Sequence, residues 1–260
     1  MAIPVTYLIL FASLIAVISA TYSFAIVKIG SKGALLKASV AKQNMLALDD
    51  AVHTVAWNLG ASSTVYMDDC GSVFQVSPTA KSFAINFTDN SAFSDVVFNS
   101  SIGKTFYKLE PSEANYDGLF IRGDKRAIIN QSASTVTQLY YLAGSDAEEL
   151  TLSYRPSATS TLIGTEDGKP LNLIRIHVIN FNSSQNLMLT GKFYLKITTL
   201  NITTITRQYE FNSSLSSLAL RALFDGASST VQFPIISNTD GAIVNLEIVI
   251  CSIKIQTVGV

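Results

Sequence analysis

Residues Val5–Val27 read VTYLILFASLIAVISATYSFAIV and contain no charged side chain. A helix needs roughly 20 apolar residues to span the hydrocarbon layer of a membrane, so this run is long enough to do so. Pro4 precedes it, and proline suits the first turn of a helix because its missing N–H would have no partner there. The sequence therefore predicts a hydrophobic helix that begins almost at the first residue.

The helical pattern continues beyond this uncharged run. Apolar residues recur at alternating spacings of four and three residues, which is the seam of a heptad repeat. Gly60 follows the last of them and could end the helix in the left-handed conformation. Gly30 and Gly33 lie between the two halves, where we expect a bend or local melting, since each glycine weakens a helix by about 1 kcal/mol. We predict one helix from Pro4 to Leu59, about 80 Å long. The seam consists of Ala34, Ala38, Ala41, Met45, Leu48, Val52, Val55 and Leu59.

Two ordinary explanations of this segment are a secretory signal peptide and a plain membrane anchor. A signal peptide fits poorly, because residues 1–4 carry no Lys or Arg and the apolar run exceeds the usual length of about 7–15 residues. A plain anchor conflicts with the positive-inside rule. Lys28, Lys32, Lys37 and Lys42 follow the apolar run, so the rule places the body of the chain in the cytoplasm, whereas the sequons described below indicate that it is extracellular. We expect that a basic leader set the orientation and was then removed.

The rest of the chain is typical of an all-β domain. The chain has 260 residues, of which 48% are hydrophobic and 14% charged, and its net charge is −1. This low and balanced charge gives no indication of nucleic-acid binding. Short strand-like runs separated by turn residues follow residue 60, and strands do not alternate with helices. We predict an α+β chain with a helix at 1–60 and an antiparallel β-sandwich or barrel-like domain at 61–260.

Some local expectations within this domain are specific. Asp68–Gly71 should form a hairpin turn, and Asn201 should lie in a turn between two long strands. Ser214–Phe224 has helical spacing and should form a short helix or cover a turn. The strand Leu171–Asn180 alternates, with one face formed by Leu171, Leu173, Arg175, His177 and Ile179, and the other by Asn172, Ile174, Ile176, Val178 and Asn180.

Asn-X-Ser/Thr sequons give the clearest indication of a modification site. All six lie beyond Gly60, in or near predicted turns, and none has proline in the middle position. We expect N-linked glycans on most of them if the domain is extracellular, whereas Asn86 and Asn201, whose middle residues are apolar, are the ones that we expect to be buried instead. Turn chemistry alone is the alternative explanation, since Asn and Ser favour turns. The acceptor residues are Asn86, Asn99, Asn130, Asn182, Asn201 and Asn212.

The two cysteines, Cys70 and Cys251, flank the predicted β domain. Outside the cell they could form a disulfide that closes a loop of about 180 residues and stabilises the fold by about 4–5 kcal/mol. Two separate buried thiols are the alternative.

Residues for catalysis or metal binding are sparse. The chain has two histidines, His53 and His177, and lacks a phosphate-binding loop, a GxSxG motif and an HExxH motif. The neighbouring carboxylates Asp49 and Asp50 should point in different directions, and Trp57 is expected in a core or an interface. We therefore expect no enzymatic activity, no metal and no cofactor.

An uncharged helix that begins near residue 1, continues as an amphipathic helix and carries a β-rich body resembles the layout of type IV pilin-like proteins, above all the archaeal adhesive pilins and archaellins. The resemblance covers residues 1–60 in detail. Val5 stands where bacterial pilins have Glu, a residue that archaeal filament proteins commonly lack. The expected assembly residues are Leu8, Phe11, Leu14, Ile15, Ile18, Tyr22, Phe24, Met45, Leu48, Val52, Val55 and Leu59.

The resemblance implies a function and a set of partners. A prepilin peptidase would remove the leader, and an assembly ATPase with its membrane platform would move the helix from the membrane into a bundle of identical helices. The glycosylated β domain would then form the outside of an extracellular, adhesive filament. The alternatives are an archaellin of a motility filament and a monomeric membrane-anchored surface glycoprotein.

Overall fold

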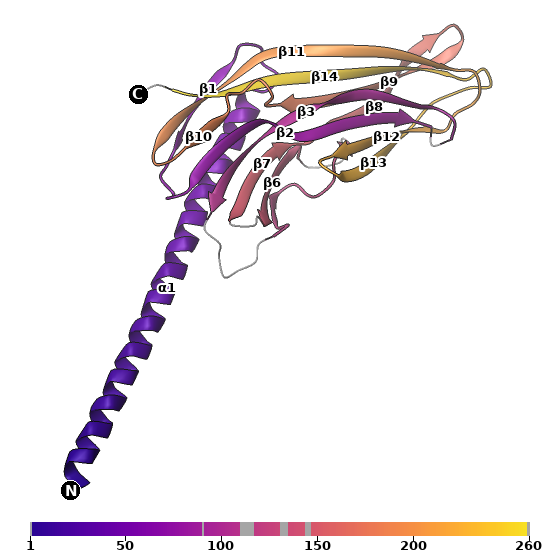
Figure 1. The fold of residues 1–260 in the computed structure, drawn as a ribbon. Coiled ribbons are helices and arrows are strands. Elements are labelled where there is room, and N and C mark those ends of the chain that lie inside the picture. Colours follow the sequence, from indigo (N-terminus) through magenta and orange to yellow (C-terminus); the bar gives the residue numbers. More distant parts are fainter. Residues whose placement is uncertain (1, 90, 110–116, 131–134, 144–146, 259–260) are drawn as a thin grey trace.

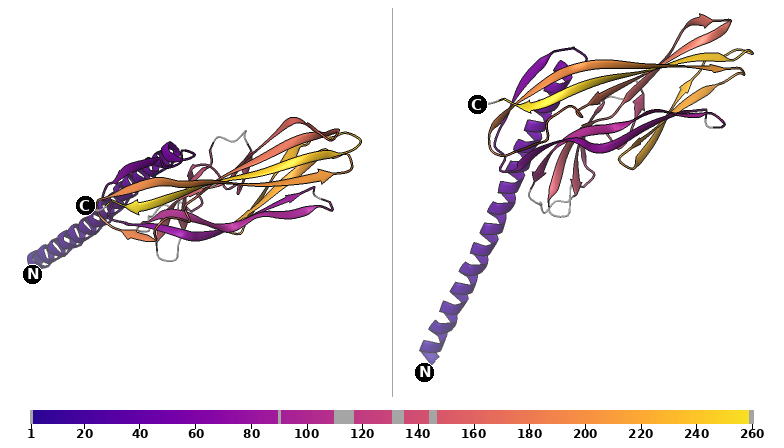
Figure 2. Two further views of the ribbon diagram at one scale, coloured as in Figure 1. Left: turned by 90° about the horizontal axis from the view of Figure 1, so that it is seen from above. Right: turned by 45° about the horizontal axis from the view of Figure 1, so that its top comes forward.

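The computed structural model describes residues 2–89, 91–109, 117–130, 135–143 and 147–258. It consists of one long helix, α1 (Ala2–Val55), and a strand-rich domain against which the C-terminal half of this helix packs (Figure 1). The N-terminal half of α1 protrudes from the domain in every view (Figure 2). The prediction of a long apolar helix followed by a strand-rich domain is confirmed.

The helix differs from the prediction at its middle and at its end. It is continuous through Gly30 and Gly33, so the local melting expected there does not occur. It ends at Val55, and the side-chain hydroxyl of Thr199 donates a buried hydrogen bond of 2.8 Å to the carbonyl oxygen of Val55. Trp57 then turns the chain with a φ of 69°, and Gly60 has the expected left-handed conformation at a φ of 75° but lies in the following turn, so it does not end the helix. A side chain from a distant strand therefore supplies a hydrogen bond to a carbonyl group at the helix end, and the local sequence did not predict that the helix ends there.

The first sheet has six strands in the spatial order β1-β11-β14-β9-β8-β5. The pairs β9–β14 and β5–β8 are parallel and the other pairs are antiparallel, so the prediction of an antiparallel domain holds only in part. The strands are β1 (Ser62–Met67), β5 (Ile129–Asn130), β8 (Ser157–Glu166), β9 (Lys169–Asn180), β11 (Phe193–Phe211) and β14 (Ala242–Thr257).

The second sheet has eight strands. Seven follow the order β13-β12-β2-β3-β7-β6-β4, and the short β10 pairs with β2. The strands are β2 (Val73–Thr88), β3 (Ser94–Leu109), β4 (Phe120–Arg122), β6 (Thr137–Ala143), β7 (Glu148–Tyr154), β10 (Leu187–Leu189), β12 (Ser217–Phe224) and β13 (Ala227–Pro234).

Three local predictions are wrong. Asp68–Gly71 does not close a hairpin, because β1 and β2 belong to different sheets. Asn201 lies inside the long strand β11, where an irregular register opposite β14 replaces the expected turn. Most of Ser214–Phe224 forms β12, paired on both sides with β13 and β2. In each case pairing with distant strands outweighed a local sequence preference.

Two hydrophobic clusters form the core. The first, here called the helix cluster, joins the C-terminal half of α1 to strands of both sheets, and the second lies between the two sheets away from the helix. On β14, Leu246 and Ile248 belong to the second cluster, whereas Cys251 and Ile253 belong to the helix cluster. Because side chains alternate across a strand, these pairs lie on opposite faces. Near Cys251 and Ile253, the helix and strands of the eight-stranded sheet beside it thus cover one face of the six-stranded sheet, and near Leu246 and Ile248 the eight-stranded sheet covers the opposite face.

The alternation predicted for β9 is confirmed. Ile174, Ile176 and Val178 are buried in the cluster between the sheets. Arg175 and His177 lie on the opposite face, which is the face that α1 covers further along the sheet.

Candidate functional site

The protruding half of α1 exposes apolar side chains on all sides. Every residue from Thr6 to Gly30 is exposed, and an 18-residue window of the helix has a mean hydropathy of 2.1 with none of it buried. The helix is thus long and apolar enough to cross a membrane, a property that a signal sequence shares. A helix that is apolar all round needs lipid or other protein around it. The expected assembly residues in this half, all exposed, are Leu8, Phe11, Leu14, Ile15, Ile18, Tyr22 and Phe24.

The other expected assembly residues have a different environment. Met45, Leu48, Val52 and Val55 are at most 1% exposed and pack inside the helix cluster of their own domain. Leu59 lies beyond the end of α1 and is 70% exposed. The heptad seam therefore serves mainly to hold the helix in its own domain.

A buried polar network fixes α1 to the eight-stranded sheet. Asp49 is fully buried and accepts hydrogen bonds from Tyr154 Oη at 2.7 Å and Thr137 Oγ1 at 2.8 Å. Arg122 Nη1 lies 2.5 Å from Asp49 Oδ2 and 3.1 Å from Asp50 Oδ1. His53 Nε2 completes the network at 3.3 Å from Asp49 Oδ1. The two carboxylates thus contact one guanidinium group, although we expected them to point apart.

The network shifts the pKa values of its members in opposite directions. Burial raises the pKa of Asp49, but hydrogen bonds from His53, Tyr154, Thr137 and Arg122 outweigh it, so this pKa is lowered from 3.8. The hydrogen bond to Asp49 raises the pKa of His53 above 6.5. Both shifts favour the charged forms, so the network is most stable as an ion pair.

The cysteines are separate thiols in this structure. Cys70 and Cys251 are both buried and free, and both belong to the helix cluster. The sequence left open a disulfide between Cys70 and Cys251 or two separate buried thiols, and the structure has the two buried thiols. Burial raises the pKa of each thiol, so neither is poised as a reactive thiolate.

The sequons are spread over strands as well as turns. Asn99, Asn182, Asn201 and Asn212 are exposed, so the expectation that Asn201 is buried is wrong. Asn86 is half-buried within β2, rather than buried. Asn99 and Asn201 lie inside β3 and β11, rather than in turns. Asn130 is half-buried in β5, and the other two residues of its sequon lie outside the described residues.

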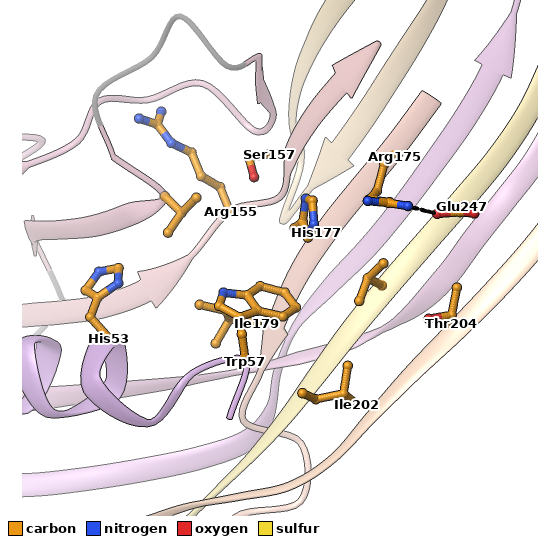
Figure 3. Close-up of a pocket in the computed structure, with 12 residues that line it drawn as sticks. His53, Trp57, Arg155, Ser157, Arg175, His177, Ile179, Ile202, Thr204 and Glu247 are labelled. Atoms are coloured by element: carbon orange, nitrogen blue, oxygen red, sulfur yellow. Dashed lines mark hydrogen bonds and ion pairs between the residues drawn. The ribbon is translucent and has the colours of Figure 1, made fainter. Parts of the chain in front are cut away.

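A groove lies where the helix ends. The face of the six-stranded sheet that α1 covers continues past Trp57 and lines a cavity of about 630 Å³, here called the helix-end groove (Figure 3). Trp57 stands in it at 38% exposure, with its ring edge-to-face against His177 at 5.2 Å between centroids. The lining residues are His53, Trp57, Val136, Arg155, Ser157, Arg175, His177, Ile179, Ile202, Thr204, Glu247 and Val249.

Charges in the groove are paired. Arg175 on β9 and Glu247 on the neighbouring β14 lie opposite each other, and Arg175 Nε donates a hydrogen bond of 2.7 Å to Glu247. Arg155 is buried and directs its guanidinium group away from the groove to Asp124. Burial, and then the charge of Arg175, lower the pKa of His177 below 6.5, so this ring is neutral at pH 7.

Sequence reasoning did not find this groove. It treated Trp57 as a core or interface residue and placed His177 on one face of a strand, without a role. The alternation of β9 placed Arg175 and His177 on one face, but nothing in the sequence placed the end of a helix more than 100 residues earlier beside them.

Among the residues that the structure describes, no group of three or more His, Cys, Asp and Glu side chains could hold a metal ion. Comparisons of the chain with protein-family models, with curated proteins and with solved structures found no match.

Proposed function

We propose that this chain is the structural subunit of an archaeal type IV pilus-like filament. In this proposal Val5–Val27 lies in the membrane first and then packs against the same segment of other copies in the filament core. The strand-rich domain is a β-sandwich at 61–260 that stays outside the cell as the surface of the filament. The chain acts as a building block and an adhesin, with no catalytic role.

One observation carries the proposal: a folded domain presents a rigid helix whose protruding half is apolar on every side. From Thr6 to Gly30 this half is about 37 Å long at roughly 1.5 Å per residue. Its burial in a bundle of identical helices would remove the same apolar surface from water as a membrane does. The transfer between the two environments can therefore be near neutral and be driven by an assembly ATPase on a membrane platform, after a prepilin peptidase has removed a leader.

The exposed sequons support an extracellular location. Asn99, Asn182, Asn201 and Asn212 present their side chains to solvent on the strand-rich domain, where oligosaccharyltransferase can reach them. In this proposal their N-linked glycans coat the filament surface and contribute to adhesion.

The test replaces Leu14, which is 56% exposed in the protruding half, by aspartate in the native cell. Leu14→Asp would bury an unpaired carboxylate in the bundle, which costs several kcal/mol, so filaments should disappear from the cell surface. Negative-stain electron microscopy and mass spectrometry of sheared surface material measure the outcome. Met188→Asp is the matched control, because Met188 is 71% exposed on the strand-rich domain.

The wild-type result separates the alternatives. Thin filaments composed of this chain support the proposal, and a motility assay then distinguishes a pilus from an archaellum. A chain that stays in the membrane fraction as a detergent-soluble monomer would instead be an anchored surface glycoprotein. Filaments that persist in Leu14→Asp would show that the helix bundle is not the assembly contact.

A further inference from the structure

We propose that the helix-end groove is a binding site for an uncharged saccharide, with Trp57 as the surface on which a sugar ring stacks. This inference goes beyond filament assembly, because it assigns a ligand to a cavity that the assembly contact does not use. It rests on the conformation of Trp57, on the polar side chains around it, and on the position of the groove in the molecule.

Trp57 is held in an unfavourable conformation. A bulky residue with a φ of 69° is an outlier, since the left-handed region favours glycine, and such strain collects at functional sites. Core packing does not account for it, because 38% of the residue is exposed. A glycine at this position would end the helix more easily. The strained tryptophan instead places a large apolar ring in the wall of the groove.

The polar side chains of the groove suit hydroxyl groups. Arg175 and Glu247 form a planar donor next to a planar acceptor, and the neutral ring of His177 both donates and accepts. Ser157 and Thr204 add hydroxyl groups at the edges. A sugar offers many hydroxyl groups that donate and accept at once, together with an apolar face for Trp57.

The charge balance favours an uncharged ligand. An anion in this groove would have to face Glu247, and a cation would have to face Arg175. The charges of Arg175 and Glu247 neutralise each other across a hydrogen bond of 2.7 Å. A charged ligand would therefore have to displace one of these two side chains in order to pair with the other. A volume of about 630 Å³ falls within the usual range for small-molecule sites, about 300–1,000 Å³, and can hold one or two sugar rings.

The groove also lies where a surface ligand can reach it. It begins at the C-terminal end of α1, which is the end opposite the protruding half (Figures 1 and 3). A bundle formed by the protruding halves would therefore leave this end of the helix outside the core. Binding can be tested on the single chain, without any filament.

The first experiment uses the fact that Trp57 is the sole tryptophan of the chain. The full-length chain is purified in a detergent without a sugar headgroup, and Trp57 fluorescence is followed as methyl glycosides of mannose, galactose, glucose and N-acetylglucosamine are added. Saturable changes with a dissociation constant on the order of 1 mM are expected for ligands of about a dozen heavy atoms. Glucuronate and galactose 6-sulfate serve as charged probes. Saturation by the charged sugars alone, or by none of the sugars up to about 50 mM, would overturn the proposal.

Substitutions at Trp57 separate binding from folding. Trp57→Gly removes the ring and relieves the strained φ, so the melting temperature should hold or rise while binding falls at least about tenfold. For this variant, binding is measured by saturation-transfer NMR, and Trp57→Phe should keep part of the affinity. Leu59→Ala, at a residue that is 70% exposed and does not line the groove, should bind like the wild type. A Trp57→Gly variant that melts much earlier, or binds sugar unchanged, would assign Trp57 a packing role only.

Discussion

The two halves of α1 differ in composition and in what surrounds them, because 18 of the 25 residues at 6–30 are hydrophobic, against 13 of the 25 residues at 31–55. From Thr6 to Gly30 each residue is exposed, whereas Met45, Leu48 and Val52 have no exposed surface. The first half is apolar on all sides, and the second half carries an apolar stripe with charged and polar residues beside it. The comparison shows that the half with an apolar stripe beside polar residues packs on its own domain, whereas the half that is apolar on all sides leaves its surface free for lipid or for another protein.

The sharpest way to test this comparison is to place the same charge in both halves. Leu48→Asp buries an unpaired carboxylate in the helix cluster and should cost more than about 4 kcal/mol, a large part of the roughly 5–15 kcal/mol by which a domain is ordinarily stable. Leu14→Asp should leave the unfolding of the strand-rich domain unchanged. Thermal melts of both variants in detergent, followed by Trp57 fluorescence, measure the difference. Equal melting temperatures would mean that the two halves are not distinct.

A smaller effect is expected from the polar network, which has no counterpart in the protruding half. Asp49→Ala leaves the hydroxyl groups of Tyr154 and Thr137 without their acceptor and should cost about 3 kcal/mol. The cost stays moderate because Arg122 is partly exposed and keeps its contact with Asp50. Ser13→Ala is the control, since Ser13 only bonds to a carbonyl of its own exposed helix. Urea titrations compare the two, and a loss below about 1 kcal/mol for Asp49→Ala would contradict a stabilising role of the network.

The smallest expected effect is a dependence of stability on pH. The pKa of His53 is raised in the folded chain. Its contribution to the free energy of unfolding is therefore complete below pH 6.5 and is lost as the pH rises through the pKa of the folded chain. The pKa of Asp49 is lowered, so its contribution is present above pH 3.8 and is lost as the pH falls through the folded value. The melting temperature of the wild type should therefore exceed that of His53→Gln by more at pH 5.5 than at pH 8.5. A constant difference between the two proteins would show that His53 stays neutral.

Parts of this structure were predictable from the sequence because their cause is local. The uncharged run and the heptad spacing specified α1, and the alternation of β9 specified which side chains face the core. The long strand through Asn201 and the strand at Ser217–Phe224 were missed, because their pairing partners lie far away in the chain. The helix-end groove was missed for the same reason, since Trp57 and Glu247 are 190 positions apart in the sequence and line one groove only in the folded chain.

The continuity of α1 has a mechanical consequence. One uninterrupted helix runs from the protruding half to the core of the strand-rich domain, where Leu48, Asp49 and Val52 hold it along one side. In the proposed filament, tension between the domain and the filament core would be carried by this helix. It would load these buried contacts in shear, all at once, with no flexible hinge at Gly30 or Gly33 to absorb it. The domain should therefore remain attached to α1 until the helix cluster unfolds. The force that the domain withstands would then depend on its rate of unfolding, rather than on its equilibrium stability.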